Sequence, residues 1–351
     1  MIKSLLITLT CVLILAVSGT GLWAWQGLQQ LDHSPALGEP VLFDVEPGMP
    51  FVHVARLMQA RGLVKDSFWL RVKARLSPEI TQIKAGQYEF EPGLTTNEMV
   101  AKMIAGDTKT WSIRFIEGWR FEEVRAELAR HHQLKLETTG LTDAQIMARL
   151  DAKGVYPEGW FFPDTYLFQA GDTDLEILRR AYEKMQAVLA REWESRASDL
   201  PYDTPYDALI MASIVERETG AAHEREQVAG VFVRRLKRGM RLQTDPTVIY
   251  GMGDAYDGGL SRKDLKTPTP YNTYRIAGLP PTPIAMPGEG AIHAALNPAS
   301  GKALYFVARG DGTHKFSSTL AEHQKAVRAF QLKRRKDYRS APPANEEPEQ
   351  P

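Results

Sequence analysis

The chain has 351 residues, 43% hydrophobic and 25% charged, an ordinary globular composition that is long enough for two domains. Lys plus Arg and Asp plus Glu both total 43, so net charge gives no reason to expect a nucleic-acid partner. The single cysteine, Cys11, excludes an intramolecular disulfide. The eight histidines form no HExxH or Cys/His motif, so neither a metal site nor a cofactor is expected.

The N-terminus carries an uncharged apolar stretch. Lys3 is the charged residue of segment 1–4. Segment 5–25 has no charged side chain and is long enough to span a bilayer. This pattern predicts a transmembrane anchor, with 1–4 in the cytoplasm and the body of the protein outside it. A cleaved signal peptide is the alternative, because residues 16–19 resemble a cleavage site. The polar residues 26–40 are expected to form a linker.

A weak internal repeat follows the linker. A short strand, a glycine-containing turn and an amphipathic helix are expected over 41–58, again over 87–103, and again over 113–128. The repeated unit resembles the LysM kind of glycan-binding module, and any small α+β domain would share the pattern. We expect a LysM-like subdomain over residues 41–150.

Residues 158–166 are rich in aromatic and turn-forming residues. Trp160, Phe161 and Tyr166 have ring faces that can stack on sugars. Core packing or a domain hinge would use the same residues, and this is the interpretation that the composition favours.

The stretch 204–220 predicts a buried helix with both ends marked. Thr204 is a capping residue, and Gly220 is expected in the left-handed conformation beyond the last turn. The body is apolar on almost every face, yet the last turn carries Glu216 and Glu218. Since carboxylates at the end of a buried helix are costly to desolvate, they are candidates for a functional site.

The two glutamates are not expected to share a role. Side chains two residues apart point about 200° apart around a helix. Glu218 lies over the bulkier apolar residues, which favours a raised pKa and the role of proton donor. Glu216 points the other way. The alternative is that either glutamate forms an ion pair with Arg217, Arg225 or Arg234.

Further elements are expected after this helix. A second helix is predicted over 222–238 and should end at Gly239. A β-hairpin is predicted over 303–317, followed by a charged helix over 319–336. The Pro/Glu-rich residues 340–351 are expected to be disordered.

Three short segments, in the same order along the chain, resemble those of lysozyme-like lytic transglycosylases. Glu218-Thr219 is similar to their Glu-Ser signature, residues 239–243 to their Gly-Leu-Met-Gln segment, and Tyr271-Asn272 to their Tyr-Asn segment. Longer strings resemble the endolytic murein transglycosylases, the MltG or YceG-like family, at residues 212–219, 241–250 and 278–281. The likeness covers nearly the whole chain apart from the Pro/Glu tail.

The resemblance implies roles for individual residues. Glu218 would be the single catalytic acid and base. The implied substrate-binding residues are Thr219, Gln243, Thr244, Asp245, Tyr271 and Asn272. Among these, Gln243 and Asn272 would line the groove around the scissile bond and its N-acetyl group. Thr219 departs from the serine of the broader signature but keeps a hydroxyl.

The resemblance also implies a fold and an activity. The fold would be α+β, with a transmembrane helix, the LysM-like subdomain, and a lysozyme-like, mostly helical catalytic domain over residues 151–339 with a small β-hairpin. The enzyme would cleave the MurNAc–GlcNAc β-1,4 bond of nascent peptidoglycan without water, leave 1,6-anhydroMurNAc ends and terminate glycan elongation. Its partners would be glycan strands and peptidoglycan synthases, with the anchor in the bacterial inner membrane and the body in the periplasm.

Two other functions are compatible with the same residues. A hydrolytic muramidase would need a second carboxylate, for which Asp245 and Glu216 are candidates. A non-catalytic glycan-binding scaffold would need no buried carboxylate at all, so the cost of burying Glu218 argues against it. The reducing end of the product separates the two enzymes.

Overall fold

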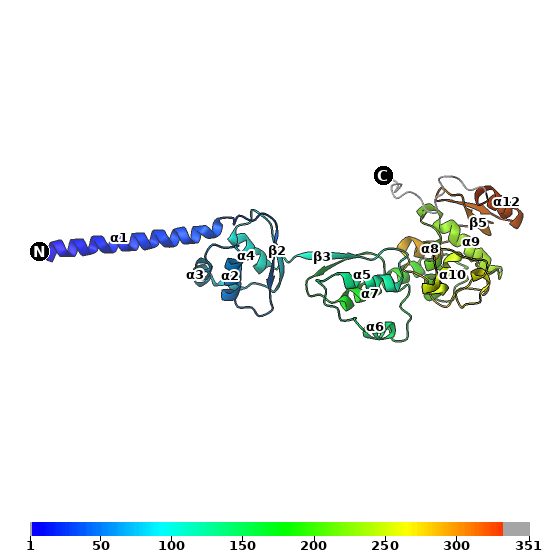
Figure 1. The fold of residues 1–351 in the computed structure, drawn as a ribbon, viewed down its shortest axis with the longest axis horizontal. Helices are drawn as coiled ribbons and strands as arrows, with labels where there is room; N and C mark the ends of the chain where they lie inside the picture. The colour runs from blue at the N-terminus through cyan, green and yellow to red at the C-terminus, as the bar shows by residue number, and fades with distance from the viewer. Residues whose placement is uncertain (1, 333–351) are drawn as a thin grey trace. The chain divides into compact units, whose positions relative to one another are not determined.

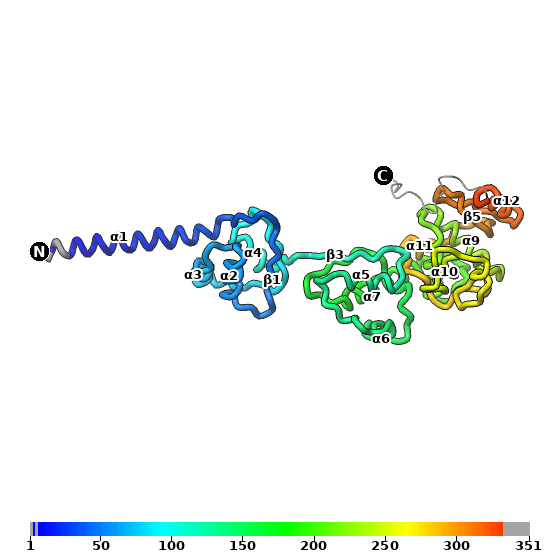
Figure 2. The backbone as a smooth tube through the Cα atoms, viewed as in Figure 1, coloured from blue at the N-terminus to red at the C-terminus, as the bar shows by residue number. Residues whose placement is uncertain are grey.

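The computed structural model describes residues 2–332 (Figures 1 and 2). As predicted, the fold is α+β, with helices and short two-stranded sheets. The chain divides into two compact units: the first comprises the residues up to Trp111 together with Leu167–Asp172, and the second comprises the others. The boundary between the two units falls after Trp111, within a strand. The LysM-like subdomain expected from the sequence extends further, to residue 150. The expected tail 340–351 and the end of the expected helix 319–336 lie outside the described residues.

Helix α1 (Ile2–Gln29) contains the predicted anchor. Residues 6–32 are long and apolar enough to cross a membrane by length and composition. The helix continues beyond residue 25, so the expected linker begins as helix. The reason is packing within the first unit, because Leu31 is fully buried and Gly27 lies so close to Trp69 that a β-carbon would overlap the indole.

The rest of the first unit is a small α+β layer. It contains β1 (Val41–Val45), α2 (Phe51–Ala60), α3 (Ser67–Leu76), β2 (Gly86–Phe90) and α4 (Thr96–Ala105). The two strands pair antiparallel, with Val41 opposite Phe90 and Val45 opposite Gly86. Alternate strand residues and one face of each helix form its core, which includes Phe43, Val45, Tyr88, Phe90, Val54, Met58, Met99 and Met103.

All three predicted strand–turn–helix repeats are present. The third joins β3 (Thr110–Arg114) to α5 (Phe121–Arg130). Each turn holds a glycine in the left-handed region, namely Gly48, Gly93 and Gly118. Because a side chain is disfavoured there, the shared glycine accounts for the shared geometry.

The second unit is mostly helical. After α5 its elements are α6 (Asp143–Arg149), β4 (Thr165–Gln169, which crosses the unit boundary), α7 (Asp174–Glu194), α8 (Pro205–Glu218), α9 (Arg225–Lys237), α10 (Asp245–Met252), α11 (Glu289–Leu296), β5 (Tyr305–Ala308), β6 (His314–Ser317) and α12 (Leu320–Phe330). The predicted hairpin is confirmed as the antiparallel pair β5–β6. The predicted helix over 222–238 begins with a 3-10 turn and, as expected, ends at a left-handed Gly239.

Helix α8 is the centre of the second unit, where α7, α9 and α11 pack against it. Its capping box is confirmed, since Thr204 accepts the Asp207 N–H at 3.3 Å while Asp207 accepts the Thr204 N–H at 2.8 Å. The predicted left-handed Gly220 is wrong. The helix ends instead at an extended Thr219, whose hydroxyl accepts the Ala221 N–H at 3.0 Å and so starts the next turn.

The aromatic segment 158–166 is mainly core. Phe161 is fully buried and Tyr166 is buried, with its hydroxyl donated to the Phe162 carbonyl at 2.6 Å. Trp160 stacks on Tyr206 with ring centroids 5.8 Å apart. These contacts favour the packing interpretation of the segment over a sugar-stacking surface.

Candidate active site

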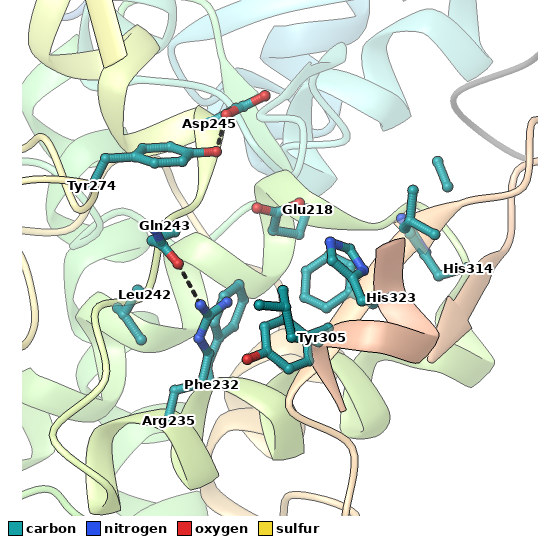
Figure 3. Close-up of a pocket in the computed structure, with 14 residues that line it drawn as sticks. Glu218, Phe232, Arg235, Leu242, Gln243, Asp245, Tyr274, Tyr305, His314 and His323 are labelled. Atoms are coloured by element: carbon teal, nitrogen blue, oxygen red, sulfur yellow. Dashed lines mark hydrogen bonds between the residues drawn. The ribbon is translucent and has the colours of Figure 1, made fainter. Parts of the chain in front are cut away.

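Glu218 is the last residue of α8, and its side chain lines a cavity of about 400 Å³ (Figure 3). In Figure 3 it lies between Gln243 and Asp245 on one side and Tyr305 and His323 on the other. The cavity is therefore formed where the end of α8, the segment before α10 and the β5–β6 hairpin meet. It is lined by side chains that include Arg235, Leu242, Gln243, Asp245, Tyr274, Tyr305, Phe306 and His314.

The environment of Glu218 favours a protonated carboxyl near neutral pH. Desolvation by the surrounding protein is the largest effect and raises its pKa to about 7. The hydroxyl of Thr244 donates a hydrogen bond to Oε1 and lowers the pKa, while the charge of Asp245 raises it. A carboxyl with such a pKa can both donate and accept a proton at neutral pH.

Glu216 faces away from this cavity, as the helical spacing predicted. Its side chain is 6% exposed and lies 3.5 Å from Nη2 of Arg225. The backbone N–H of Gly288 donates to Oε2 at 3.0 Å. Burial raises its pKa, and the Arg225 charge opposes this. Arg225 also contacts Glu117 at 3.1 Å, so Glu216 ties α8 to two other segments of the second unit.

Gln243 occupies a strained position at the rim of the cavity. Its φ is +54°, in the left-handed region that non-glycine residues rarely adopt. The strain is maintained by two contacts: its N–H donates to the Thr273 carbonyl at 3.2 Å, and its Oε1 accepts from Arg235 at 2.6 Å. Strain of this kind clusters at functional sites.

Asp245 is the other carboxylate that lines the cavity together with Glu218. It is the first residue of α10, where a negative charge is favoured by the helix dipole. The hydroxyl of Tyr274 donates to its Oδ1 at 2.6 Å. Burial and this contact raise the pKa of Tyr274, so the phenol stays protonated and continues to donate. Asp245 is therefore held as an acceptor beside Glu218.

Four residues expected to bind substrate do not line the cavity, and one of them, Thr244, is buried and donates its hydroxyl to Glu218. Thr219 is buried and holds the turn after α8. Asn272 is fully buried, and its amide donates to the carbonyls of Asp264, Leu265 and Thr267. The expectation that Asn272 faces the groove is therefore corrected, since its hydrogen bonds hold the loop. Tyr271 lines a different cavity and contacts the Thr282 hydroxyl at 2.9 Å.

Arg235 is a cavity residue that our sequence analysis missed. Arg235 lies in the last turn of the predicted helix 222–238, where basic residues are common, yet it is only 7% exposed. Its guanidinium lies 5.5 Å from the ring centre of Tyr305, and within residues 2–332 its Nε has no hydrogen-bond partner and it forms no ion pair. The sequence did carry a signal that Arg235 is buried. It follows Phe232 by three residues, which places it on the apolar stripe of the helix. A buried guanidinium of this kind suits a carbonyl or carboxylate oxygen of a ligand.

In the described part of the chain, no three His, Cys, Asp or Glu side chains converge as a possible ligand set. The chemistry that the cavity offers is proton transfer by Glu218, hydrogen bonding by its polar rim and a single buried cation.

Comparisons with known proteins find a matching family model, similar sequences and a similar solved structure. The model of the YceG-like family matches residues 43–329. An endolytic murein transglycosylase of Bacillus subtilis (strain 168) is 30% identical over 316 residues, which cover 83% of this chain and 84% of the relative. One from Streptococcus pneumoniae is 24% identical over 323 residues, which cover 82% of this chain and only 58% of that protein. The crystal structure of a YceG-like protein from Listeria monocytogenes matches with a TM-score of 0.52 at 28% identity, covering 82% of this chain and 99% of that one.

Proposed function

The chain belongs to the YceG-like family, and from that premise we propose that it is a lytic transglycosylase that cleaves peptidoglycan strands between MurNAc and GlcNAc. The observation that carries the proposal is Glu218, a desolvated carboxyl with a pKa of about 7 at the edge of a polar cavity. The names of the relatives in Bacillus and Streptococcus support the same activity.

The proposed reaction needs one acid and base. The Glu218 carboxyl protonates the glycosidic oxygen, and the C1–O bond breaks. The substrate's own acetamide stabilises the positive charge that develops at C1. The carboxylate then takes the proton of the C6 hydroxyl, whose oxygen bonds to C1 and closes the 1,6-anhydro ring. No water is consumed, and Glu218 regains its proton for the next turnover.

The neighbours of Glu218 have supporting roles in this proposal. The Thr244 hydroxyl stabilises the carboxylate after the first proton transfer. The amide of Gln243 and the guanidinium of Arg235 lie where they can hold acetamide or lactyl-peptide oxygens of the substrate. Thr219 and Asn272 support the loops that carry these groups.

A hydrolytic muramidase is the second candidate, and the position of Asp245 favours it. A hydrolase would use Asp245 as a base or nucleophile opposite Glu218, since both line one cavity. Glu216 is unsuited to that role because it faces away and is paired with Arg225.

Mass spectrometry of the product tests the proposal against this alternative. Purified wall glycan is digested with the detergent-solubilised full chain. We expect 1,6-anhydroMurNAc ends, and none from Glu218→Gln. Reducing MurNAc ends carrying oxygen from labelled water, formed only when Asp245 is intact, would establish the hydrolase instead.

We further propose that α1 anchors the protein in the inner membrane and that the first unit binds glycan weakly, so that cleavage acts on strands near the synthases that make them. The apolar length of α1 and the strand–helix–helix–strand order of the first unit support this. N-terminal sequencing and protease accessibility in spheroplasts test the anchor. A mature protein that begins near Ser18 or Gly19 would contradict it.

A further inference from the structure

A second cavity of about 350 Å³ lies in the same unit. Its lining includes Arg120, Tyr156, Glu158, Tyr250 and Tyr271. None of these residues lines the cavity of Glu218. The proposed reaction makes no use of it.

The second cavity is built around a buried carboxyl. Glu158 is 4% exposed, and its two oxygens accept hydrogen bonds from the Phe121 N–H and the Tyr250 hydroxyl, both at 3.0 Å. The Tyr250 hydroxyl in turn lies 3.3 Å from that of Tyr156, which is 47% exposed. Burial raises the pKa of Glu158 to about 7. The carboxyl therefore orders a row of hydroxyls that leads to the surface.

A purely structural role for Glu158, in which it holds the start of α5, would account for only part of this arrangement. The contact of Glu158 with the Phe121 N–H at the start of α5 needs one carboxyl oxygen. It does not require the two tyrosine hydroxyls or the exposed ring of Tyr156. These groups are available to a ligand.

The cavity is lined both by aromatic rings and by polar groups. Tyr250 and Tyr271 pack edge to face with centroids 4.9 Å apart, and the Arg120 guanidinium lies 5.4 Å from the Tyr250 ring centre. The charges at the rim are paired, because Arg120 contacts Glu122 at 3.2 Å and the third charged residue there, Asp143, contacts Arg125 at 2.8 Å. A surface with ring faces, ordered hydroxyls and compensated charge suits an uncharged, polyhydroxylated ligand such as a pyranose ring.

Two segments connect this cavity with that of Glu218. Helix α10 begins with Asp245 at the first cavity, and Tyr250 at the second cavity lies about 8 Å further along the helix axis and points about 140° away around it. The segment 271–274 places Tyr271 at the second cavity and Tyr274 at the first. Both cavities can therefore contact one extended ligand.

We propose that this second cavity is a distal subsite that binds a sugar residue of the same glycan strand, beyond the bond that is cut. This inference rests on the proposed function for the nature of the strand. It assigns Tyr156 and Tyr250 to binding, with Glu158 as the residue that positions their hydroxyls. The subsite adds affinity for long strands and takes no part in proton transfer.

The test compares strand lengths in the full chain. Tyr156→Ala removes an exposed ring, so the fold is retained, and Tyr256→Ala is the matched control because Tyr256 lines neither cavity. The probes are peptide-free wall glycan oligomers, from a single repeat to long strands. For long strands we expect Tyr156→Ala to raise KM about 5- to 30-fold with kcat unchanged, the effect of losing an aromatic anchor. The shortest cleaved oligomers and the control should behave as wild type.

Calorimetric binding of long strands in a Glu218→Gln background provides a readout without cleavage. There too, Tyr156→Ala should weaken binding by the same factor. An unchanged KM in an active enzyme, or an equal loss on short oligomers, would overturn the distal subsite while leaving the proposed function intact. Absence of cleavage by the wild type would instead overturn the proposed function, and calorimetry would still report on the cavity.

Discussion

Thr244 donates its hydroxyl to Oε1 of Glu218, which joins the start of α10 to the end of α8. The hydrogen bond stabilises the charged carboxylate and opposes the desolvation that raises the pKa. Thr244 is itself positioned by its N–H, which donates to the Thr273 hydroxyl at 3.1 Å. The pKa of the proposed acid thus depends on three segments that are distant in sequence.

The two glutamates of α8 should separate on substitution. Glu218→Gln keeps the shape and removes the titratable proton, so we expect activity on wall glycan to fall by roughly 10²–10⁴-fold. Glu216→Gln should keep most activity because its side chain packs with Arg225 and Gly288, away from the cavity. Product formation is measured by mass spectrometry, with melting temperature as the folding control. A folded but inactive Glu216→Gln, or an active Glu218→Gln, would reverse the assignment.

Removing the Thr244 hydroxyl should change the pH dependence of activity. In Thr244→Val the contact that lowers the pKa of Glu218 is lost, so the pKa rises above about 7. In the pH profile of kcat/KM, the alkaline limb is where the acid loses its proton. This limb should move to higher pH by roughly one unit. Thr282→Val, outside this cavity, is the matched control. An alkaline limb that stays in place would show that Thr244 does not tune the acid.

Glu218 should also make stability depend on pH. Its pKa rises from 4.5 to about 7 on folding, so between these values the native state binds more protons than the unfolded state. The free energy of unfolding therefore falls as pH rises through this window, by about 3 kcal/mol in all. Glu218→Gln should be more stable than wild type above pH 7 and similar to it below pH 4.5.

Denaturant unfolding across this range measures that difference. Glu226→Gln, a substitution on the exposed face of α9, is the control and should follow the wild type. A constant difference between Glu218→Gln and wild type at all pH values would mean that Glu218 is not desolvated on folding.

The strain at Gln243 should trade stability against activity. Its φ of +54° is favourable for glycine, so Gln243→Gly should raise stability by up to about 1 kcal/mol. Activity should fall by about 2- to 10-fold, the effect of one lost hydrogen bond. Asp199→Gly is the matched control, because Asp199 has a φ of +61° in an exposed loop. It should stabilise the protein without loss of activity, and an equal loss in both variants would argue against a role for Gln243.

Local chemistry in the sequence determined the central helix and the separation of its two glutamates. The Thr204–Asp207 capping box, the apolar body of α8 and the opposite directions of Glu216 and Glu218 follow from helix periodicity. The desolvation of Glu218 follows as well, because the residues one turn earlier are all buried. The glycine turns of the repeats were predicted for the same reason, since each depends on a few adjacent residues.

Tertiary structure decided which polar side chains face the cavity. Thr244 reaches Glu218, but Asn272 turns inward to three carbonyls, and sequence spacing does not distinguish these outcomes. In the sequence, Arg235 resembles any basic residue near a helix end. Only the tertiary structure shows that the β5–β6 hairpin places Tyr305 over it. Side-chain direction in loops is set by backbone dihedrals and by the buried polar groups that must be satisfied, and both depend on segments far apart in the chain.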